Sequence, residues 1–517
     1  MLGAAHHPGW IKEFKPMRIF DIKHPDKGAP QAPSESLTAA ASKNVFWNMV
    51  SSFGVSGIRF TGTAVLARIL FPEDFGIIAM AYLITEVIFI FGNLGMGAAL
   101  IHRQDVDDEY LNTSFWSSLA IGMILTLSAY LSSPLAGIFF KHAVVVSVIQ
   151  CLSVNFFISS VVSVQTVLLT KNLQFKELAI VEITTTVFRV AVILTFAFLG
   201  FRFWSIVVGS IVERVLKTTI FYIRSAWRPA FQFSVKKYMI LFNYGKHLYG
   251  GSFLAYFNRN MDFIITGRVF GAADLGYYQF AFNIPHLVLS NFTQKVGQVL
   301  FPVYSKVQDD KERVRRGVLK TTELISILTF PLMFGLMFTA RDFILTVYGN
   351  KWLPSVLPLQ ILCLSGAVKS VNSVTGILFM SQGRPDISFK WGLFILPLTI
   401  GVIYYCSRWS IVGVAIGMVV LTFLGFVAVK IALDLIDTKM SRFFRHMIPG
   451  ILGSLGMVLI LYLLNRVGFV RDMVCWQRLF LNIFFGVLIY AGLVRVFFND
   501  SRALLFQVIK GLCGDKK

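Results

Sequence analysis

Residues 68–76 read RILFPEDFG and residues 268–276 read RVFGAADLG, so Arg, an apolar stretch, Asp and Gly recur at an offset of 200 residues. Further matches keep this offset without a gap: Ser52-Phe53 with Ser252-Phe253, Arg59 with Arg259, Ala81 with Ala281, Gly97 with Gly297, and Leu100 with Leu300. A run of matches at one constant offset is typical of an internal duplication. The chain is therefore predicted to consist of two related halves.

Long apolar segments flank both copies of this motif. The chain has 517 residues, of which 56% are hydrophobic and 15% are charged, and it contains 50 Phe. The apolar residues are concentrated in runs of about 20 residues, the length that crosses the hydrocarbon core of a bilayer. A soluble domain does not need so many such runs. The sequence therefore predicts an integral membrane protein.

Breaks at charged residues, Gly and Pro divide the apolar sequence into about fourteen predicted membrane-spanning helices. They lie near residues 44–70, 76–100, 112–140, 143–168, 178–200, 203–223, 239–266, 276–303, 322–344, 355–380, 390–406, 410–433, 447–465 and 476–498. An even number of spans separates corresponding positions of the repeat. The two halves therefore share one orientation and are related by a pseudo-twofold axis along the membrane normal.

The predicted fold is all-α, with two parallel-repeat six-helix lobes around a central cavity and two further C-terminal helices. The expected boundaries are an N-terminal tail at 1–43, an N-lobe at 44–223, a linker at 224–238, a C-lobe at 239–433, a helix pair at 447–498 and a C-terminal tail at 499–517. Lys and Arg are about twice as frequent in the loops after even-numbered spans as in the other loops. This bias predicts that those loops, the linker and both tails are cytoplasmic.

Several classes of function do not fit this sequence. The net charge is +21, but Lys and Arg lie in short loops between apolar runs, which indicates membrane topology and contact with anionic lipids, not nucleic-acid binding. The five Cys are scattered without CxxC spacing, so neither a metal site nor a disulfide framework is predicted. Neither HExxH nor GxSxG occurs, and we expect no enzymatic activity.

The repeated motif has a structural interpretation. An Asp just after the break can cap the following helix, and an Arg just before it lies near the negative end of the preceding helix. The residues assigned to this structural motif are Arg68, Asp74 and Gly76 in the first half and Arg268, Asp274 and Gly276 in the second.

Longer stretches around the motif resemble a known family. They are LARILFPEDFGIIAMA at 66–81, LGMGAALI at 94–101, Phe115-Trp116, DFIITGR at 262–268, Gly276-Tyr277-Tyr278, Phe301-Pro302 and SQGRP at 381–385. Together they resemble the bacterial polysaccharide-repeat flippases of the multidrug/oligosaccharidyl-lipid/polysaccharide exporter superfamily. The resemblance covers about residues 44 to 440, and the extended N-terminal tail lies outside it.

This resemblance implies a flippase that moves a polyprenyl-diphosphate-linked oligosaccharide from the cytoplasmic to the periplasmic leaflet of the bacterial inner membrane. The product would enter exopolysaccharide, capsule or O-antigen assembly, with membrane lipids, the polysaccharide polymerase and the export machinery as candidate partners. No cofactor is expected, and transport would be coupled to protons or Na⁺ or driven by consumption of the substrate. The alternatives are a cation-coupled drug antiporter of the same superfamily and a non-transporting scaffold of a polysaccharide-assembly complex.

Ionisable residues within predicted spans are the candidate site residues, because a charge there costs roughly 2.5 to 3.5 kcal/mol unless it has a partner or water. Arg59 and Arg259 are repeat-related, and a guanidinium group suits phosphate oxygens. In the structural alternative, Arg259 pairs with Asp262 and Arg59 with a neighbouring helix, and these pairs lock the lobes. Further candidates to line the cavity are Asn48, Lys246, His247, Asp262, Lys295 and Lys369.

The other charged residues of the predicted spans have different local surroundings along the chain. Glu86 in the second span is a candidate proton carrier, and the alternative is that it is buried against an Arg. Lys295 and Lys369 have no acidic neighbour along the chain. Glu182 with Arg189 and Glu213 with Lys217 have the spacing of charges on one helix face, and a structural role is expected for the second pair.

Overall fold

The computed structural model describes residues 34–92, 96–103, 105–245 and 249–497. Within these ranges the ordered elements are helices, and no strand occurs. Ten of the described helices are long and apolar enough to cross a membrane. The prediction of an all-α integral membrane protein is confirmed, and each predicted span coincides with one helix or with two consecutive helices.

The helices of the first half are α1 Ser34–Ile69, α2 Pro72–Gly92, α3 Met96–His102, α4 Asp108–Phe140, α5 Ala143–Ser160, α6 Ser163–Lys171, α7 Phe175–Phe198 and α8 Trp204–Arg224. Those that follow are α9 Val235–Gly245, α10 Tyr249–Phe270, α11 Ala272–Lys306, α12 Lys311–Val347, the 3₁₀ helix η2 Asn350–Ser355, α13 Val356–Ser381, α14 Pro385–Cys406, α15 Ile411–Asp434, α16 Met440–Leu464, α17 Gly468–Arg471 and α18 Cys475–Phe497.

The two halves use the same packing pattern. In the first half α1 packs on α7, α4 on α5, α2 on α5, and α7 on α8. In the second half α10 packs on α14, α12 on α13, α11 on α13, and α14 on α15. Each contact thus has a counterpart between helices at equivalent places in the chain order. The duplication seen in the sequence is therefore also a duplication of structure.

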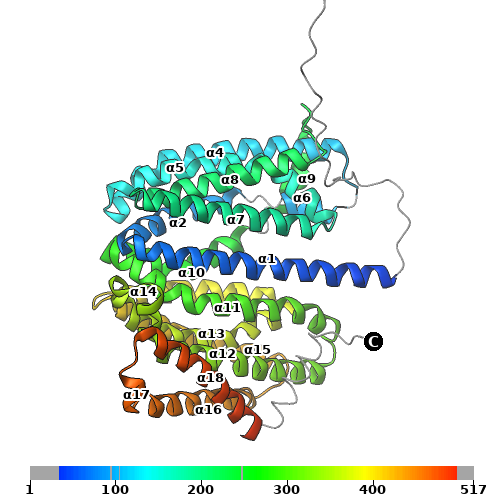
Figure 1. Cartoon of the computed structure of the whole chain (residues 1–517). Coiled ribbons are helices and arrows are strands. Elements are labelled where there is room, and N and C mark those ends of the chain that lie inside the picture. The colour runs from blue at the N-terminus through cyan, green and yellow to red at the C-terminus, as the bar shows by residue number, and fades with distance from the viewer. Residues whose placement is uncertain (1–33, 93–95, 104, 246–248, 498–517) are drawn as a thin grey trace, which may run out of the picture.

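Figure 1 shows the long helices running side by side, with most of the first half above and the second half below. Helix α1 runs along the boundary between the two groups. Helices α16 and α18 lie at the lower edge of Figure 1, where both pack on α12. The Arg478 guanidinium joins α18 to Asp342 of α12 through two hydrogen bonds, one of them 2.7 Å between Nε and Oδ2. The last two long helices are therefore anchored to the second half.

The structure differs from the predicted boundaries at several places. Helix α1 begins at Ser34, inside the predicted tail, and the rest of that tail lies outside the described residues, as do residues 498–517. The second predicted span contains α2 and α3, and the fourth contains α5 and α6. The short helix α9 begins at Val235, inside the predicted linker at 224–238. The break between α5 and α6 was not predicted because no Gly, Pro or charged residue occurs from residue 152 to residue 170.

The halves meet where α2 crosses α11, and the repeated glycines make this contact. A Cβ atom on Gly76 would lie 2.5 Å from the carbonyl carbon of Ala272, and one on Gly276 would lie 2.8 Å from that of Pro72. Only glycine permits two backbones to approach so closely. The glycines of the motif are therefore required by the contact between the halves.

The two motif aspartates differ in their surroundings. Oδ2 of Asp74 accepts a hydrogen bond of 2.9 Å from the backbone N–H of Phe71, and Oδ1 lies 3.0 Å from Nε of Arg202. This confirms the predicted cap at the start of α2. Asp274 lies in the first turn of α11, but the backbone N–H of the residue before that helix, Gly271, donates a hydrogen bond of 3.2 Å to the carbonyl of Gly267. The two copies of the motif are thus more alike in their backbone arrangement than in the contacts of their aspartates.

Candidate functional site

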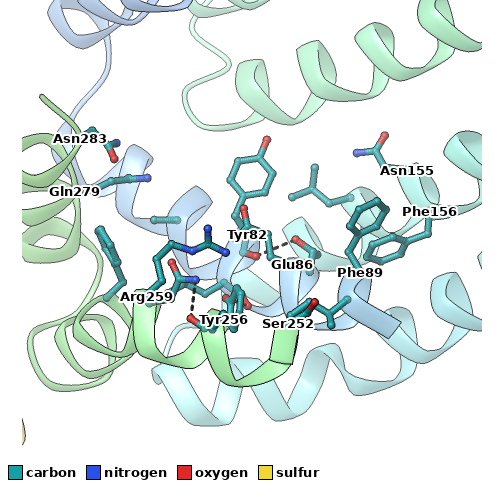
Figure 2. A pocket seen from close by; sticks show the side chains of 18 of the residues that line it. Tyr82, Glu86, Phe89, Asn155, Phe156, Ser252, Tyr256, Arg259, Gln279 and Asn283 are labelled. Carbon is teal, nitrogen blue, oxygen red and sulfur yellow. Dashed lines mark hydrogen bonds between the residues drawn. The ribbon is translucent and has the colours of Figure 1, made fainter. Parts of the chain in front are cut away.

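A cavity of about 840 Å³ lies between the halves, next to the α2–α11 contact. Residues of α2, α5 and α8 line it from the first half, and residues of α10 and α11 line it from the second (Figure 2). On α2 the lining runs from Ala79 to Ile90. At 1.5 Å per residue, this wall extends from about 10 Å to about 27 Å beyond the start of the helix. The cavity therefore lies at the depth of the predicted bilayer.

Two arginines and one carboxylate line this cavity. Arg214 comes from α8, Arg259 from α10 and Glu86 from α2. Arg259 points from α10 towards α2 in Figure 2, and its charge interacts with that of Glu86. Because two cations face one anion, the lining has a positive excess. Such a cavity is suited to an anionic ligand, since each guanidinium offers several donors to phosphate oxygens.

The rest of the lining combines aromatic and polar side chains with a few aliphatic ones. Aromatic rings come from both halves, as do side-chain amides that can bond to hydroxyl groups: Tyr82, Phe89, Phe156, Tyr256, Phe263, Phe282, Asn155, Asn260, Gln279 and Asn283. The Tyr256 hydroxyl donates a hydrogen bond of 2.6 Å to the carbonyl of Leu83 across the boundary between the halves. Rings and amides in combination are suited to a polyhydroxylated ligand.

Of the predicted site residues, Arg259 and Glu86 line the cavity, but Arg59 does not. The guanidinium of Arg59 lies 3.7 Å from Glu182 on α7 and 3.6 Å from Glu213 on α8. The same group of charges includes Arg189, 3.1 Å from Glu213, and Lys217, which bonds to Glu182. The structure thus places Arg59 within the first half, where it pairs with neighbouring helices as the structural alternative predicted, but these pairs do not join the two lobes.

The charges predicted to share one face of α7 and one face of α8 pair with each other across the two helices. The ion pairs run from Arg189 to Glu213 and from Lys217 to Glu182. The four charges therefore join α7 to α8, which fits the structural role expected for Glu213 and Lys217.

Asp262 and Lys369 are buried in the second half. The Asp262 carboxylate is 1% exposed and accepts a hydrogen bond of 2.8 Å from the Tyr278 hydroxyl. Lys369 on α13 interacts electrostatically with Asp262 and lies 5.5 Å from the ring centre of Phe282. Asp262 therefore bonds to Tyr278, not to Arg259, and Lys369 has an acidic partner that its neighbours in the sequence did not predict.

Four further candidates cannot be placed at the cavity. Lys246 and His247 lie outside the described residues. Asn48 lies in α1 and Lys295 in α11, but their side chains are outside the described part of the structure. In the residues that the structure does describe, no three His, Cys, Asp or Glu gather in a group that could hold a metal ion.

Arg214 is a charged residue of the cavity that was not among the predicted site residues. It is adjacent to Glu213, whose carboxylate points into the charge group within the first half. Consecutive residues on a helix point about 100° apart, so Arg214 faces a different side from Glu213 and reaches the cavity. A helical projection of α8 that separated these two residues would have given the signal.

Comparison with known proteins agrees with this geometry. The solved structure of the lipid II flippase MurJ in an inward closed conformation matches with a TM-score of 0.69 and 16% identity, over 87% of this chain and 99% of that chain. The arrangement of helices is therefore that of a multi-pass membrane transporter fold. The sequence profile of a family described as polysaccharide biosynthesis protein matches residues 65–357. The chain belongs to this family, and the predicted resemblance is confirmed.

Two curated relatives cover most of the chain. The lipopolysaccharide biosynthesis protein WzxC of Escherichia coli (strain K12) is 27% identical over 425 residues, which are 81% of this chain and 83% of that protein. The teichuronic acid biosynthesis protein TuaB of Bacillus subtilis (strain 168) is 25% identical over 476 residues, which are 91% of this chain and 99% of that protein. The similarity thus extends across both halves and is not confined to one domain.

Proposed function

We propose that this chain is a flippase that carries a polyprenyl-diphosphate-linked oligosaccharide from the cytoplasmic to the periplasmic leaflet of the bacterial inner membrane. The observation that carries the proposal is the cavity, which has a positive excess at bilayer depth and is lined from both halves. The names of the relatives, which describe lipopolysaccharide and teichuronic acid biosynthesis, support the class of substrate.

The lining residues suit the parts of such a substrate. Arg259 and Arg214 would bind the diphosphate from opposite halves, since guanidinium groups can each donate two bonds to phosphate. The aromatic rings and amides would contact the sugars, and the polyprenyl chain would stay in the lipid. Glu86, whose charge interacts with that of Arg259, would balance the arginine while no phosphate is bound.

Transport would proceed by alternating access. The two lobes, residues 44–223 and 239–433, would rock about the pseudo-twofold axis and expose the cavity to one side at a time. The bias of Lys and Arg among the loops supports cytoplasmic termini. With this orientation the C-terminal ends of α1 and α10 face the periplasm. The inverse orientation would reverse the direction of transport.

A cavity of this charge argues against an antiporter for organic cations. Cationic drugs favour acidic or purely aromatic surroundings, whereas Arg214 and Arg259 would repel them. A scaffold without transport would gain nothing from charges that line a cavity between its halves, because each such charge costs free energy in a membrane.

The first experiment depletes the protein and measures the amount and sidedness of lipid-linked oligosaccharide with a probe that cannot cross the membrane. Accumulation on the cytoplasmic face is expected. Unchanged sidedness together with retention of cationic drugs would replace the proposal with the antiporter.

The second experiment tests the cavity arginines. Arg259→Ala and Arg214→Ala should each lower the flipping rate by at least about tenfold, because each removes charge-assisted hydrogen bonds to the diphosphate. Arg466→Ala is the matched control, since that guanidinium lies just beyond the end of α16, bonds to the Tyr462 hydroxyl and does not line the cavity. Normal flipping by both cavity variants at normal protein abundance would contradict the assignment of these arginines.

A further inference from the structure

The two motif arginines make reciprocal contacts between the halves. Nε of Arg68, at the end of α1, donates a hydrogen bond of 3.1 Å to the carbonyl of Val347 in the last turn of α12, and the same guanidinium bonds to the carbonyl of Thr346. Arg268, at the end of α10, donates to the carbonyl of Ile138 in the last turn of α4 at 3.3 Å, and also to Phe139. Each arginine thus caps a helix of the other half.

This exchange follows the symmetry of the fold. Helices α1 and α10 occupy equivalent places in the two halves, as do α4 and α12. The free carbonyls at the end of a helix carry partial negative charge, so a cation is stabilised there. Because both arginines are exposed, water can replace the carbonyls as partners. The hydrogen bonds of Arg68 and Arg268 to these carbonyls can therefore break and form again when the halves move.

The second half also caps α1 with residues of η2. Nζ of Lys351 donates to the carbonyl of Arg68 at 2.8 Å and to that of Leu70 at 3.1 Å. The indole N–H of Trp352 donates to the carbonyl of Ala67 at 2.9 Å. These bonds add to the Arg68 contact at the same helix end, so the free carbonyls of α1 have partners from the other half.

An aromatic cluster lies beside these polar contacts. The Phe75 ring of α2 contacts Phe280 of α11 and Trp352 of η2, at ring-centre distances of 4.9 and 5.4 Å. The Trp352 side chain is fully buried. Because the cavity lining begins at Ala79, one helical turn beyond Phe75, these rings separate the cavity from the exposed arginines. The cluster therefore closes this end of the cavity to water.

We propose that Arg68 and Arg268 are the paired latch of a gate whose seal is Phe75, Phe280 and Trp352. The latch holds the halves together at this end while the cavity is reached from the other end, and it opens when the halves rock. This inference rests on the proposed function for its role in transport, and it assigns a conformational role to the residues that identify the sequence repeat.

The test measures access to the cavity. Ala255→Cys, on the α10 wall of the cavity, serves as the reporter in a variant without the natural cysteines. A thiol reagent that cannot cross the membrane is applied to intact cells and, separately, to inside-out vesicles. In the parent protein the reporter should react slowly with reagent applied on the side where α1 and α10 end. The aromatic seal lies between the reporter and the reagent on that side.

Removal of the latch should change the rates in opposite directions on the two sides. Arg68→Ala and Arg268→Ala should each raise labelling from the gated side by about tenfold, because each removes charge-assisted hydrogen bonds, and the double variant should raise it further. Labelling from the other side should fall. Arg68→Lys, which keeps the charge but lacks the fork of donors, should give an intermediate rate.

Arg408→Ala is the matched control, since its guanidinium contacts the Tyr405 ring of the same half. Equal labelling of the parent and the double variant from both sides, at normal abundance of folded protein, would overturn the latch. Because labelling needs no substrate, the result is separable from the proposed function. If the latch variants change the labelling but the parent protein flips no lipid-linked oligosaccharide, the gate would be retained and the flippase proposal rejected.

Discussion

Substitution of the interface glycines tests the arrangement of the two halves most directly. In Gly76→Ala the new methyl group would lie 2.5 Å from the carbonyl carbon of Ala272, whereas carbon atoms in contact stay about 3.5 Å apart. The obstacle is backbone, so no side-chain rotation relieves it. Because the carbonyl oxygen of Ala272 would lie closer still than its carbon, α2 and α11 must separate by more than about 1 Å. Overpacking of this kind costs about 1–3 kcal/mol. The closed arrangement at this end should therefore be weakened by about fivefold to 150-fold.

The assay is the cysteine reporter at position 255, combined with thermal unfolding of the purified protein in detergent. Gly276→Ala should give a similar result, because its methyl group would approach the backbone of Pro72 in the same way. Gly57→Ala is the matched control in α1, since no atom lies within 4 Å of its added Cβ. If Gly76→Ala labelled and unfolded like Gly57→Ala, the close approach of α2 and α11 would be refuted.

Three further substitutions probe other contacts. Arg478→Leu should destabilise the fold by about 3–5 kcal/mol, because it leaves the largely buried Asp342 carboxylate unpaired. In thermal unfolding, adding Asp342→Leu should restore most of this loss. No recovery in the double variant would contradict the pairing. Asp74→Asn should cost about 1 kcal/mol, since it weakens the cap of α2 and the ion pair with Arg202, and an unchanged unfolding temperature would argue against that cap. Trp352→Phe keeps a ring in the seal but loses the hydrogen bond to α1, so it should cost about 1 kcal/mol and raise reporter labelling less than Arg68→Ala does; a larger rise would assign the latch to Trp352.

The membrane class and the duplication could be predicted because both depend on local sequence. Apolar runs of spanning length occur whatever the helices pack against, and the constant offset between Gly76 and Gly276 is visible without a structure. The break between α5 and α6, within the fourth predicted span, was not predictable in this way, because no Gly, Pro or charged residue marks it in the sequence.

The candidate site was only partly predictable. Arg259 and Glu86 line the cavity, whereas Arg59, the repeat partner of Arg259, lies in a charge group within the first half. Equivalent positions of a duplicated sequence need not keep equivalent neighbours. The two acidic residues that pair with Arg59 come from α7 and α8, and the position of Arg59 in the repeat does not predict them. Arg214 was missed because its helical neighbours form that same charge group.

The many membrane crossings and the two halves in one orientation follow from the amino-acid sequence, because the apolar runs have spanning length and the motif recurs at a constant offset. Which charges face the cavity, and that Arg68 and Arg268 cap helices of the opposite half, follow from helix packing. The physical reason is that an arginine in a spanning helix needs a partner, and the partner comes from whichever helix packs beside it. That choice is made by packing between segments hundreds of residues apart.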